Sequence, residues 1–233
     1  EAFQYYLLGA SNKLAKERGA CEYFNRTKYS DGILPIDTYK KDLDEVCNIK
    51  LKYDWESLRE EIKEHGVRHS TLSAQMPSES SSIVSNATNG VEPPRGYLSI
   101  KKSKKGPLKQ IVPQYQSLKN YYTLLWEMPG NEGYINVMAV IQKFFDQAIS
   151  GNWSYNPTHY PDNEVPMSIM FKDLLTTYKL GWKTSYYQNT YDFKGEDVEE
   201  LREEISTPLE QEAPHPEPSS KKELDEECEA CAI

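Results

Sequence analysis

The segment PMSIMFKDLLTTYKLGWKTSYYQN, from Pro166 to Asn189, decides the fold class of this 233-residue chain. Proline is favoured at a helix start, and the apolar spacing after Pro166 predicts a helix to Lys179. The side chains expected to point inward are Ile169, Met170, Leu174 and Tyr178. The run from Gly181 is rich in β-prone residues and predicts a buried strand. A helix that leads directly into a buried strand indicates an α/β fold.

Similar signals outline the other elements. A first helix is predicted over Ala2–Arg18, with Gly19 at its end and Asp54 and Gly66 bounding a second helix. The expected inward face of the first helix comprises Phe3, Tyr6, Leu7, Leu14 and Ala15. Alternating residues predict a small β-hairpin from Tyr97–Lys101 and Leu108–Val112. Further expectations are helices over Tyr115–Trp126 and Gly133–Ile149, the second deeply packed, and a polar loop over Gly151–Val165.

Composition limits the classes of function. The net charge of -9 argues against a nucleic-acid partner, and no segment is long and apolar enough to cross a bilayer. The four cysteines are too few and too unevenly spaced for a disulfide-stapled secreted scaffold, so we expect a soluble protein of the reducing cytoplasm. Because the chain begins within a helical pattern at Glu1, we expect it to be a piece of something larger.

A change in composition predicts two parts. Residues 1–190 carry the apolar patterns of a folded domain, whereas residues 191–233 are dominated by Glu, Asp and Pro and predict a flexible, disordered acidic tail. The tail ends with Cys228 and Cys231, which are close enough to form a disulfide by thiol exchange. A redox-active dithiol shuttle is the best chemical interpretation. The alternatives are incidental exposed thiols and half of a zinc site, although Cys21 and Cys47 lack the companion spacing.

The most distinctive stretch is TLSAQMPSESSSIVSNATNGVEPPRG, from Thr71 to Gly96. A strand-like run reaches Pro77 and is followed by a cluster of hydroxyl groups around one carboxylate: Ser78, Glu79, Ser80, Ser81 and Ser82. A strand-to-helix turn here would present backbone N–H groups and hydroxyls to an anion such as phosphate. A serine-rich surface loop is the alternative. The adjacent Tyr186 and Tyr187 indicate little by themselves, since the chain has 17 tyrosines.

Several long motifs together resemble the large, catalytic α subunit of class I ribonucleotide reductases. They are the Thr71–Tyr97 stretch, DGILPIDTYKKDLD at Asp31–Asp44, LLWEMPGNEGY at Leu124–Tyr134, KTSYYQNT at Lys183–Thr190 and the terminal cysteine pair. The resemblance spans essentially the whole chain but only the C-terminal third or so of that subunit. It implies that residues 1–190 form the C-terminal part of a ten-stranded α/β barrel, with the hairpin and the acidic tail as additions.

The resemblance also implies roles for individual residues. The turn Pro77–Ser81 would bind the substrate diphosphate, with Glu79, Ser80 and Ser81 as the strongest candidates. Tyr186 and Tyr187 would relay a radical from the small subunit to the active-site cysteine. Cys228 and Cys231 would reduce the active-site disulfide again after turnover and would themselves be reduced by thioredoxin or glutaredoxin. Their spacing is closer than in the best-known bacterial members, which leaves the docking of the reductant open.

Other parts of the active site lie outside the sequence. The resemblance places the radical-bearing cysteine before this segment, and neither Cys21 nor Cys47 sits in a matching context. We therefore expect ribonucleoside diphosphate reduction only with a chain that carries the N-terminal part and with the small β subunit, which would supply a diiron-tyrosyl radical. No cofactor or metal is expected on this chain itself. The alternative is an inactive fragment that acts only as a subunit-docking module.

Overall fold

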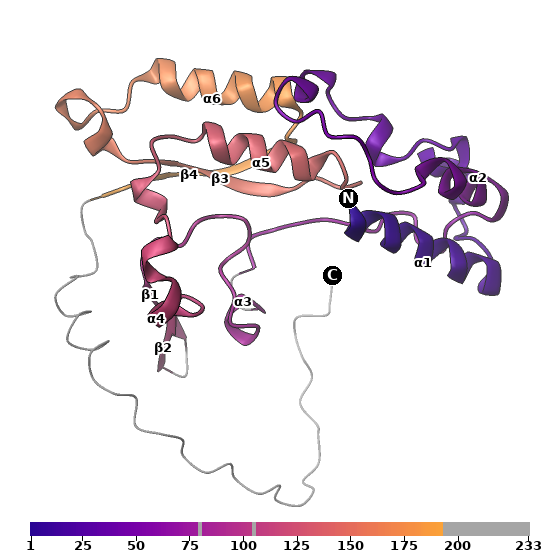
Figure 1. The fold of residues 1–233 in the computed structure, drawn as a ribbon, viewed down its shortest axis with the longest axis horizontal. Helices are drawn as coiled ribbons and strands as arrows, with labels where there is room; N and C mark the ends of the chain where they lie inside the picture. Colours follow the sequence, from indigo (N-terminus) through magenta and orange to yellow (C-terminus); the bar gives the residue numbers. More distant parts are fainter. Residues whose placement is uncertain (79–80, 104–105, 193–233) are drawn as a thin grey trace, which may run out of the picture. The chain divides into compact units, whose positions relative to one another are not determined.

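A computed structural model describes residues 1–78, 81–103 and 106–192 of the chain (Figure 1). These residues fall within one compact unit, Glu1–Lys194. None of the helices in the described ranges is long and apolar enough to cross a membrane. The predictions for Glu79, Ser80, Cys228, Cys231 and nearly all of the acidic tail lie outside the described residues.

The described elements mix helices and strands. The helices are α1 (Ala2–Arg18), α2 (Trp55–His65), α3 (Ser81–Val84), α4 (Tyr115–Leu118), α5 (Glu132–Gln142) and α6 (Met167–Leu180). The strands are β1 (Leu98–Ser103), β2 (Gly106–Ile111), β3 (Ser150–Tyr155) and β4 (Thr184–Thr190). β1 and β2 form the predicted antiparallel hairpin, in which Leu98 pairs with Ile111. The strands described form two two-stranded sheets and close no barrel.

A β3–α6–β4 unit carries the α/β character of the chain. β3 and β4 pair in parallel, α5 and α6 contact each other, and α5 shares a hydrophobic cluster with β3 (Figure 1). The predicted helix after Pro166 is confirmed, and Gly181 ends it with a left-handed conformation. β3 contradicts the loop predicted over Gly151–Val165. Its polar residues Asn152 and Ser154 hid the strand pattern, because both are buried and hydrogen-bonded to partners distant in sequence.

Helix faces were predicted less well than helix ends. α1 and its end at Gly19 are confirmed, yet Phe3 and Tyr6 are 65% and 62% exposed. The buried face instead includes Gln4, Leu8, Ser11, Asn12 and Ala15. Hydrogen bonds explain the inward position of Asn12, because its Nδ2 donates at 2.9 Å to the carbonyl oxygens of Glu61 and Gly66. Contact with α2 and its end thus turns a polar residue of α1 inward.

α6 and β4 show the same kind of difference. Ile169 and Met170 pack against the core as predicted, whereas Leu174 and Tyr178 are exposed. Asp173 lies on the buried face, where its Oδ2 accepts a hydrogen bond of 2.9 Å from Asn131. β4 is largely exposed rather than buried, since β3 is its sole strand neighbour in the part of the chain that is described.

The two helices predicted between Tyr115 and Ile149 are shorter than expected. The first is broken into α4 and two short 3₁₀ turns, Lys119–Tyr121 and Leu125–Glu127. The second, α5, ends at Gln142, whose Oε1 accepts a hydrogen bond of 3.0 Å from Ile149 N and whose Nε2 donates to the Gln147 carbonyl. Ile135, Met138 and Ile149 are fully buried as predicted.

Two hydrophobic clusters form the core. The helical cluster combines α1 and α2 with the segment between them: Leu8, Tyr29, Leu34, Ile36, Trp55, Leu58, Ile62 and Val67. The sheet cluster is built mainly from α5, β3 and the end of α6: Leu43, Tyr134, Ile135, Met138, Ala139, Ile149, Trp153, Tyr155, Leu180 and Trp182. The adjacent residues Phe144 and Phe145 each pack against a different cluster.

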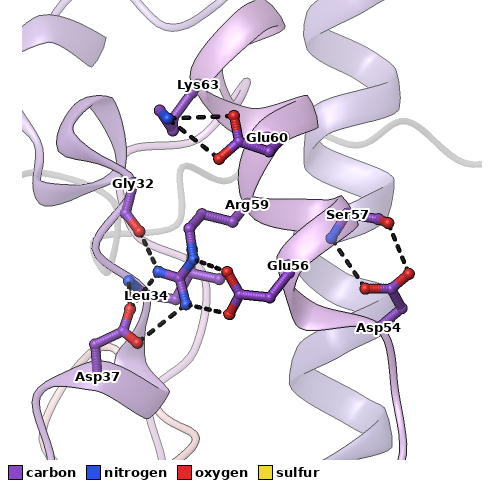
Figure 2. Close-up of polar contacts among 9 residues, drawn as sticks. All are labelled: Gly32, Leu34, Asp37, Asp54, Glu56, Ser57, Arg59, Glu60 and Lys63. Carbon is purple, nitrogen blue, oxygen red and sulfur yellow. Dashed lines mark hydrogen bonds and ion pairs between the residues drawn. The ribbon is translucent and has the colours of Figure 1, made fainter.

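A charged network fastens α2 to the segment before it (Figure 2). α2 begins after Asp54, whose side chain accepts the Ser57 N–H as predicted for a cap. Arg59 makes two hydrogen bonds to the Asp37 carboxylate, at 2.6 and 3.0 Å, and two to Glu56, at 2.9 and 3.0 Å. Arg59 also donates to the carbonyl of Gly32. One guanidinium therefore ties a helix to a turn 22 residues earlier.

Candidate active site

A cavity of about 940 Å³ joins the serine-rich turn to β4. Met76, Pro77 and Ser82 line it on one side, and Tyr186, Tyr187 and Asn189 line it on another. The lining of the cavity also includes Glu92 and Arg95, from the loop before the hairpin, and Asn152 of β3. Two stretches singled out from the sequence, about 110 residues apart, thus share one cavity.

The serine-rich turn follows a segment that is attached to the sheet. Gln75 forms a parallel bridge with Ile149, and its carbonyl accepts the Ser150 N–H at 2.9 Å. The chain then enters the short helix α3, where Ser82 N donates to the Ser78 carbonyl at 3.0 Å. This succession agrees with the strand-to-helix turn predicted from the sequence. Ser78 and Ser81 belong to the turn without being among the residues that line the cavity.

Tyr186 and Tyr187 lie against each other on β4. Their ring centroids are 4.1 Å apart with planes inclined by 55°, and their hydroxyl oxygens are 3.4 Å apart. Both side chains are slightly more than half exposed. Contact between the two phenols is the geometry that transfer of an electron and a proton from one to the other requires.

Asn152 and Glu92 stand behind this pair. Asn152 Nδ2 donates to Glu92 Oε1 at 2.6 Å, and Asn152 Oδ1 accepts from the backbone N–H of Tyr187 at 3.1 Å. Burial raises the pKa of the Glu92 carboxyl, which the hydrogen bond from Asn152 and the charge of Arg95 only partly oppose. Sequence reasoning missed both residues, because Asn152 fell in a predicted loop and Glu92, although it lies within the Thr71–Gly96 stretch, was assigned no role.

Comparison with known proteins identifies the family. The model of the family described as "Ribonucleotide reductase, barrel domain" matches residues 1–120 and 115–188. The chain belongs to this family. The resemblance drawn from the sequence motifs is therefore confirmed, and the mixed α/β structure described above is part of a ribonucleotide reductase barrel domain.

Individual relatives agree with this assignment. The chain is 65% identical over 192 residues to ribonucleoside-diphosphate reductase 1 subunit alpha of Escherichia coli, which covers 82% of this chain and 25% of that protein. It is 62% identical to the corresponding subunit alpha of Haemophilus influenzae, over 86% of this chain and 26% of the relative. The subunit alpha of phage T4 is 46% identical over 86% of this chain. The chain thus spans about a quarter of the length of these relatives.

Of the predicted site residues, the structure brings Pro77, Tyr186 and Tyr187 to one cavity. Glu79, Ser80, Cys228 and Cys231 lie outside the described residues, so their positions stay predictions. Within the ranges described, no group of three or more His, Cys, Asp or Glu side chains is placed to hold a metal ion. The described chemistry is that of hydroxyl groups, two phenols in contact and a buried amide.

Proposed function

We propose that this chain is the C-terminal part of the catalytic barrel of a ribonucleoside-diphosphate reductase large subunit. It would take part in reducing ribonucleoside diphosphates to deoxyribonucleoside diphosphates for DNA synthesis. The observation that carries this proposal is the cavity that Pro77 shares with Tyr186 and Tyr187, in a chain of the ribonucleotide reductase barrel family. A substrate held at the turn would lie within the same cavity as a redox-active pair.

The turn Pro77–Ser81 is proposed to bind the substrate diphosphate. Consecutive backbone N–H groups and serine hydroxyls in a turn make a concave site for an anion, and neither kind of donor needs a positive charge. The attachment of Gln75 to β3 supports this role, because it fixes the start of the turn relative to the sheet. Glu79, Ser80 and Ser81 stay the strongest candidates within the turn.

Tyr186 and Tyr187 are proposed to relay the radical. In each step one phenol loses an electron and a proton, and the neighbouring phenoxyl oxygen gains both, so one O–H bond breaks as another forms. The contact of the two rings and the 3.4 Å between the hydroxyl oxygens support this step. The diiron-tyrosyl radical of a small β subunit would supply the initial oxidant, and this chain would hold no cofactor of its own.

Cys228 and Cys231 are proposed to restore the active site after each turnover. A thiolate of this pair would attack the active-site disulfide, and the second thiol would release the reduced cysteines by forming the tail disulfide. Thioredoxin or glutaredoxin, in a reducing cytoplasm, would then reduce the tail. The radical-bearing cysteine would come from a chain that carries the rest of the barrel.

Reconstitution tests the relay. The chain is combined with a protein carrying the rest of the barrel and with a small β subunit, and CDP reduction is measured. We expect Tyr186→Phe to abolish turnover, because phenylalanine has no O–H to oxidise, whereas the matched control Tyr23→Phe, distant from the cavity, retains it. Turnover by Tyr186→Phe at the parent rate would refute the relay. Absence of CDP reduction by the unmodified mixture would refute the enzymatic role itself.

The same mixture tests the tail. Cys228→Ser is expected to lose turnover supported by thioredoxin while keeping turnover supported by a small dithiol, which reaches the active site directly. A fully active, thioredoxin-dependent Cys228→Ser variant would contradict the shuttle. Single-turnover CDP reduction should be the same for the variant and the parent, because one turnover needs no new reducing equivalents.

The second candidate function is that of a docking module without catalytic activity. An exposed surface of α6 favours this candidate. Five exposed apolar side chains follow one another at helical spacing along this helix: Met167, Phe171, Leu174, Leu175 and Tyr178. An exposed apolar stripe of this kind indicates a contact with another protein surface. Formation of a complex that binds the small subunit yet never reduces CDP would favour this candidate.

A further inference from the structure

The pairing of β3 with β4 changes register at the tyrosine pair. Gly151 pairs with Ser185, whereas Trp153 pairs with Gln188. Between these two pairs β3 has one residue and β4 has two, which defines a β-bulge in β4. The residue of β3 is Asn152, and the two residues of β4 are Tyr186 and Tyr187.

The bulge explains how the rings of adjacent tyrosines can touch. In a regular strand successive side chains point to opposite faces of the sheet, so neighbouring residues cannot bring their rings together. The rings of Tyr186 and Tyr187 are nevertheless 4.1 Å apart, and their hydroxyl groups are in contact. The extra residue of β4 therefore breaks the alternation where the two phenols must lie on one side.

A bulge leaves backbone groups without their usual partner on the neighbouring strand. Here the N–H of Tyr187 donates to the side-chain Oδ1 of Asn152, so an amide replaces the missing ladder acceptor. Because the backbone N–H can only donate, Oδ1 must face it, and Nδ2 must point the other way. Nδ2 meets Glu92 Oε1 at 2.6 Å, which fixes the amide in this orientation. Asn152 is 8% exposed and has little room to turn.

We propose that Asn152, oriented by Glu92, is the positioning residue that maintains the bulge and thereby the ring contact of Tyr186 and Tyr187. This inference rests on the proposed relay, since it explains how the relay geometry is held. Asn152 takes no part in the transfer itself, during which one phenol loses an electron and a proton to the phenoxyl oxygen of the other. Its effect is on the distance and angle between the rings.

Asn131, which precedes α5, provides a matched control that contacts the same strand. Its Nδ2 donates to Asp173 and its Oδ1 accepts from the backbone N–H of Ser154, each at 2.9 Å. Asn131 thus links a carboxylate to a β-strand as Asn152 does, and it is 2% exposed. It supports β3 at Ser154, where the pairing with β4 is again regular. Truncation of either side chain to alanine removes the same kind of contact, but only Asn152 contacts the tyrosine pair.

The experiment uses the reconstituted complex and compares Asn152→Ala with Asn131→Ala. For Asn152→Ala we expect kcat for CDP reduction to fall by about tenfold or more, because small displacements of reacting groups are costly, with KM for CDP nearly unchanged. Single-turnover EPR should show slower loss of the small-subunit radical by the same factor. Asn131→Ala should lower the thermal unfolding midpoint yet keep the kcat and the EPR rate of the parent.

Glu92 supplies a second pair of variants in case Asn152→Ala fails to fold. Glu92→Gln keeps an oxygen that can accept from Asn152 and should retain the parent kcat. Glu92→Ala frees the amide to turn and should lower kcat in the same direction as Asn152→Ala. The inference is overturned if Asn152→Ala keeps the parent kcat. Should that variant not fold, the inference is overturned if Glu92→Ala keeps the parent kcat.

A further variant separates this inference from the function on which it rests. Tyr187→Phe should abolish turnover if the pair forms a relay. If Tyr187→Phe abolishes turnover while Asn152→Ala and Glu92→Ala leave kcat unchanged, the positioning role is wrong and the relay stands. If Tyr187→Phe turns over at the parent rate, the proposed relay fails, and the positioning role fails with it.

Discussion

Different kinds of polar contact stabilise two regions of the molecule, the helical region, residues 1–70, and the sheet region, residues 131–192. In the helical region the long-range contacts include ion pairs at the surface, such as Arg59 with Asp37 and Lys16 with Glu61. In the sheet region buried amides of Asn131 and Asn152 each bridge a carboxylate and a strand backbone. The helical region should therefore respond more strongly to salt, whereas the sheet region should respond more strongly to changes in shape.

The largest effect is expected from Gly151→Ala in β3. A methyl group at this position would meet the hydroxyl of Tyr134, with Met138 Cε at 2.7 Å and Trp182 Cζ2 at 2.9 Å. Since two of these neighbours belong to aromatic side chains of the packed core, we expect the free energy of unfolding to fall by about 3 kcal/mol. Urea denaturation of the 233-residue chain, followed by tryptophan fluorescence, measures it.

Gly133→Ala in α5 is the control for that substitution. Nothing lies within 4 Å of the position of its new methyl group. Alanine is a better helix former than glycine, so the variant should be as stable as the parent or more stable by up to about 1 kcal/mol. Equal losses in the free energy of unfolding for Gly151→Ala and Gly133→Ala would show that close packing at β3 does not set the sheet region apart from the helical region.

The second effect concerns Asp146, which joins the two regions. Its carboxylate accepts from the Tyr29 hydroxyl of the helical cluster at 2.9 Å and from the backbone N–H groups of Leu72 and Ser73 at 2.7 and 3.0 Å. Asp146→Ala leaves these donors without their acceptor, so we expect a loss of about 2 kcal/mol in the free energy of unfolding. Differential scanning calorimetry should then show broader, less cooperative unfolding.

Tyr29→Phe separates the contribution of one donor from that of the whole junction. It removes the phenol and leaves both backbone contacts of Asp146, so the expected loss is about 1 kcal/mol with unfolding still cooperative. If Asp146→Ala costs no more than Tyr29→Phe, the backbone contacts to Leu72 and Ser73 do not hold the regions together.

The two regions also differ in how far the sequence predicted them. Gly19, Asp54 and Gly66 act within a few residues of a helix end, so the helix boundaries that they set were predicted correctly. β3 was missed because the Asn152 side chain and the Ser154 backbone N–H are hydrogen-bonded to Glu92 and Asn131, which only the folded chain brings near. The predicted face of α1 was wrong in part for the same reason, since Asn12 points inward to the backbone of Glu61 and Gly66.

The residues of the candidate site also differ in how far the sequence predicted them. Pro77, Tyr186 and Tyr187 could be named because they belong to motifs that resemble a known family. The roles of Asn152 and Glu92 could not be found in this way, because they depend on a one-residue change of register between β3 and β4. Spacing along the chain contains no signal for such a bulge. The bulge is what allows two adjacent tyrosines to bring their rings into contact.

A smaller effect than that of Asp146→Ala is expected from Arg59→Ala in the helical region (Figure 2). Partial burial opposes ionisation of Asp37, yet hydrogen bonds from Arg59 and from the Leu34 N–H lower the pKa of its carboxyl overall. Because both Asp37 and Glu56 are at least one third exposed, the loss at pH 7 should be only about 1 kcal/mol. Urea denaturation at several pH values and salt concentrations measures it.

The sign of the pH dependence follows from the lowered pKa. A carboxylate of this kind stabilises the folded chain above its unfolded pKa of about 4, and the contribution is lost as the pH falls through the folded value. The difference between Arg59→Ala and the parent should therefore shrink at low pH and in high salt. Lys63→Ala, which removes an exposed pair with Glu60, should cost only a few tenths of a kcal/mol. If the cost of Arg59→Ala is instead independent of pH and salt, its aliphatic stem against Gly32 stabilises the region, and the contrast with the sheet region fails.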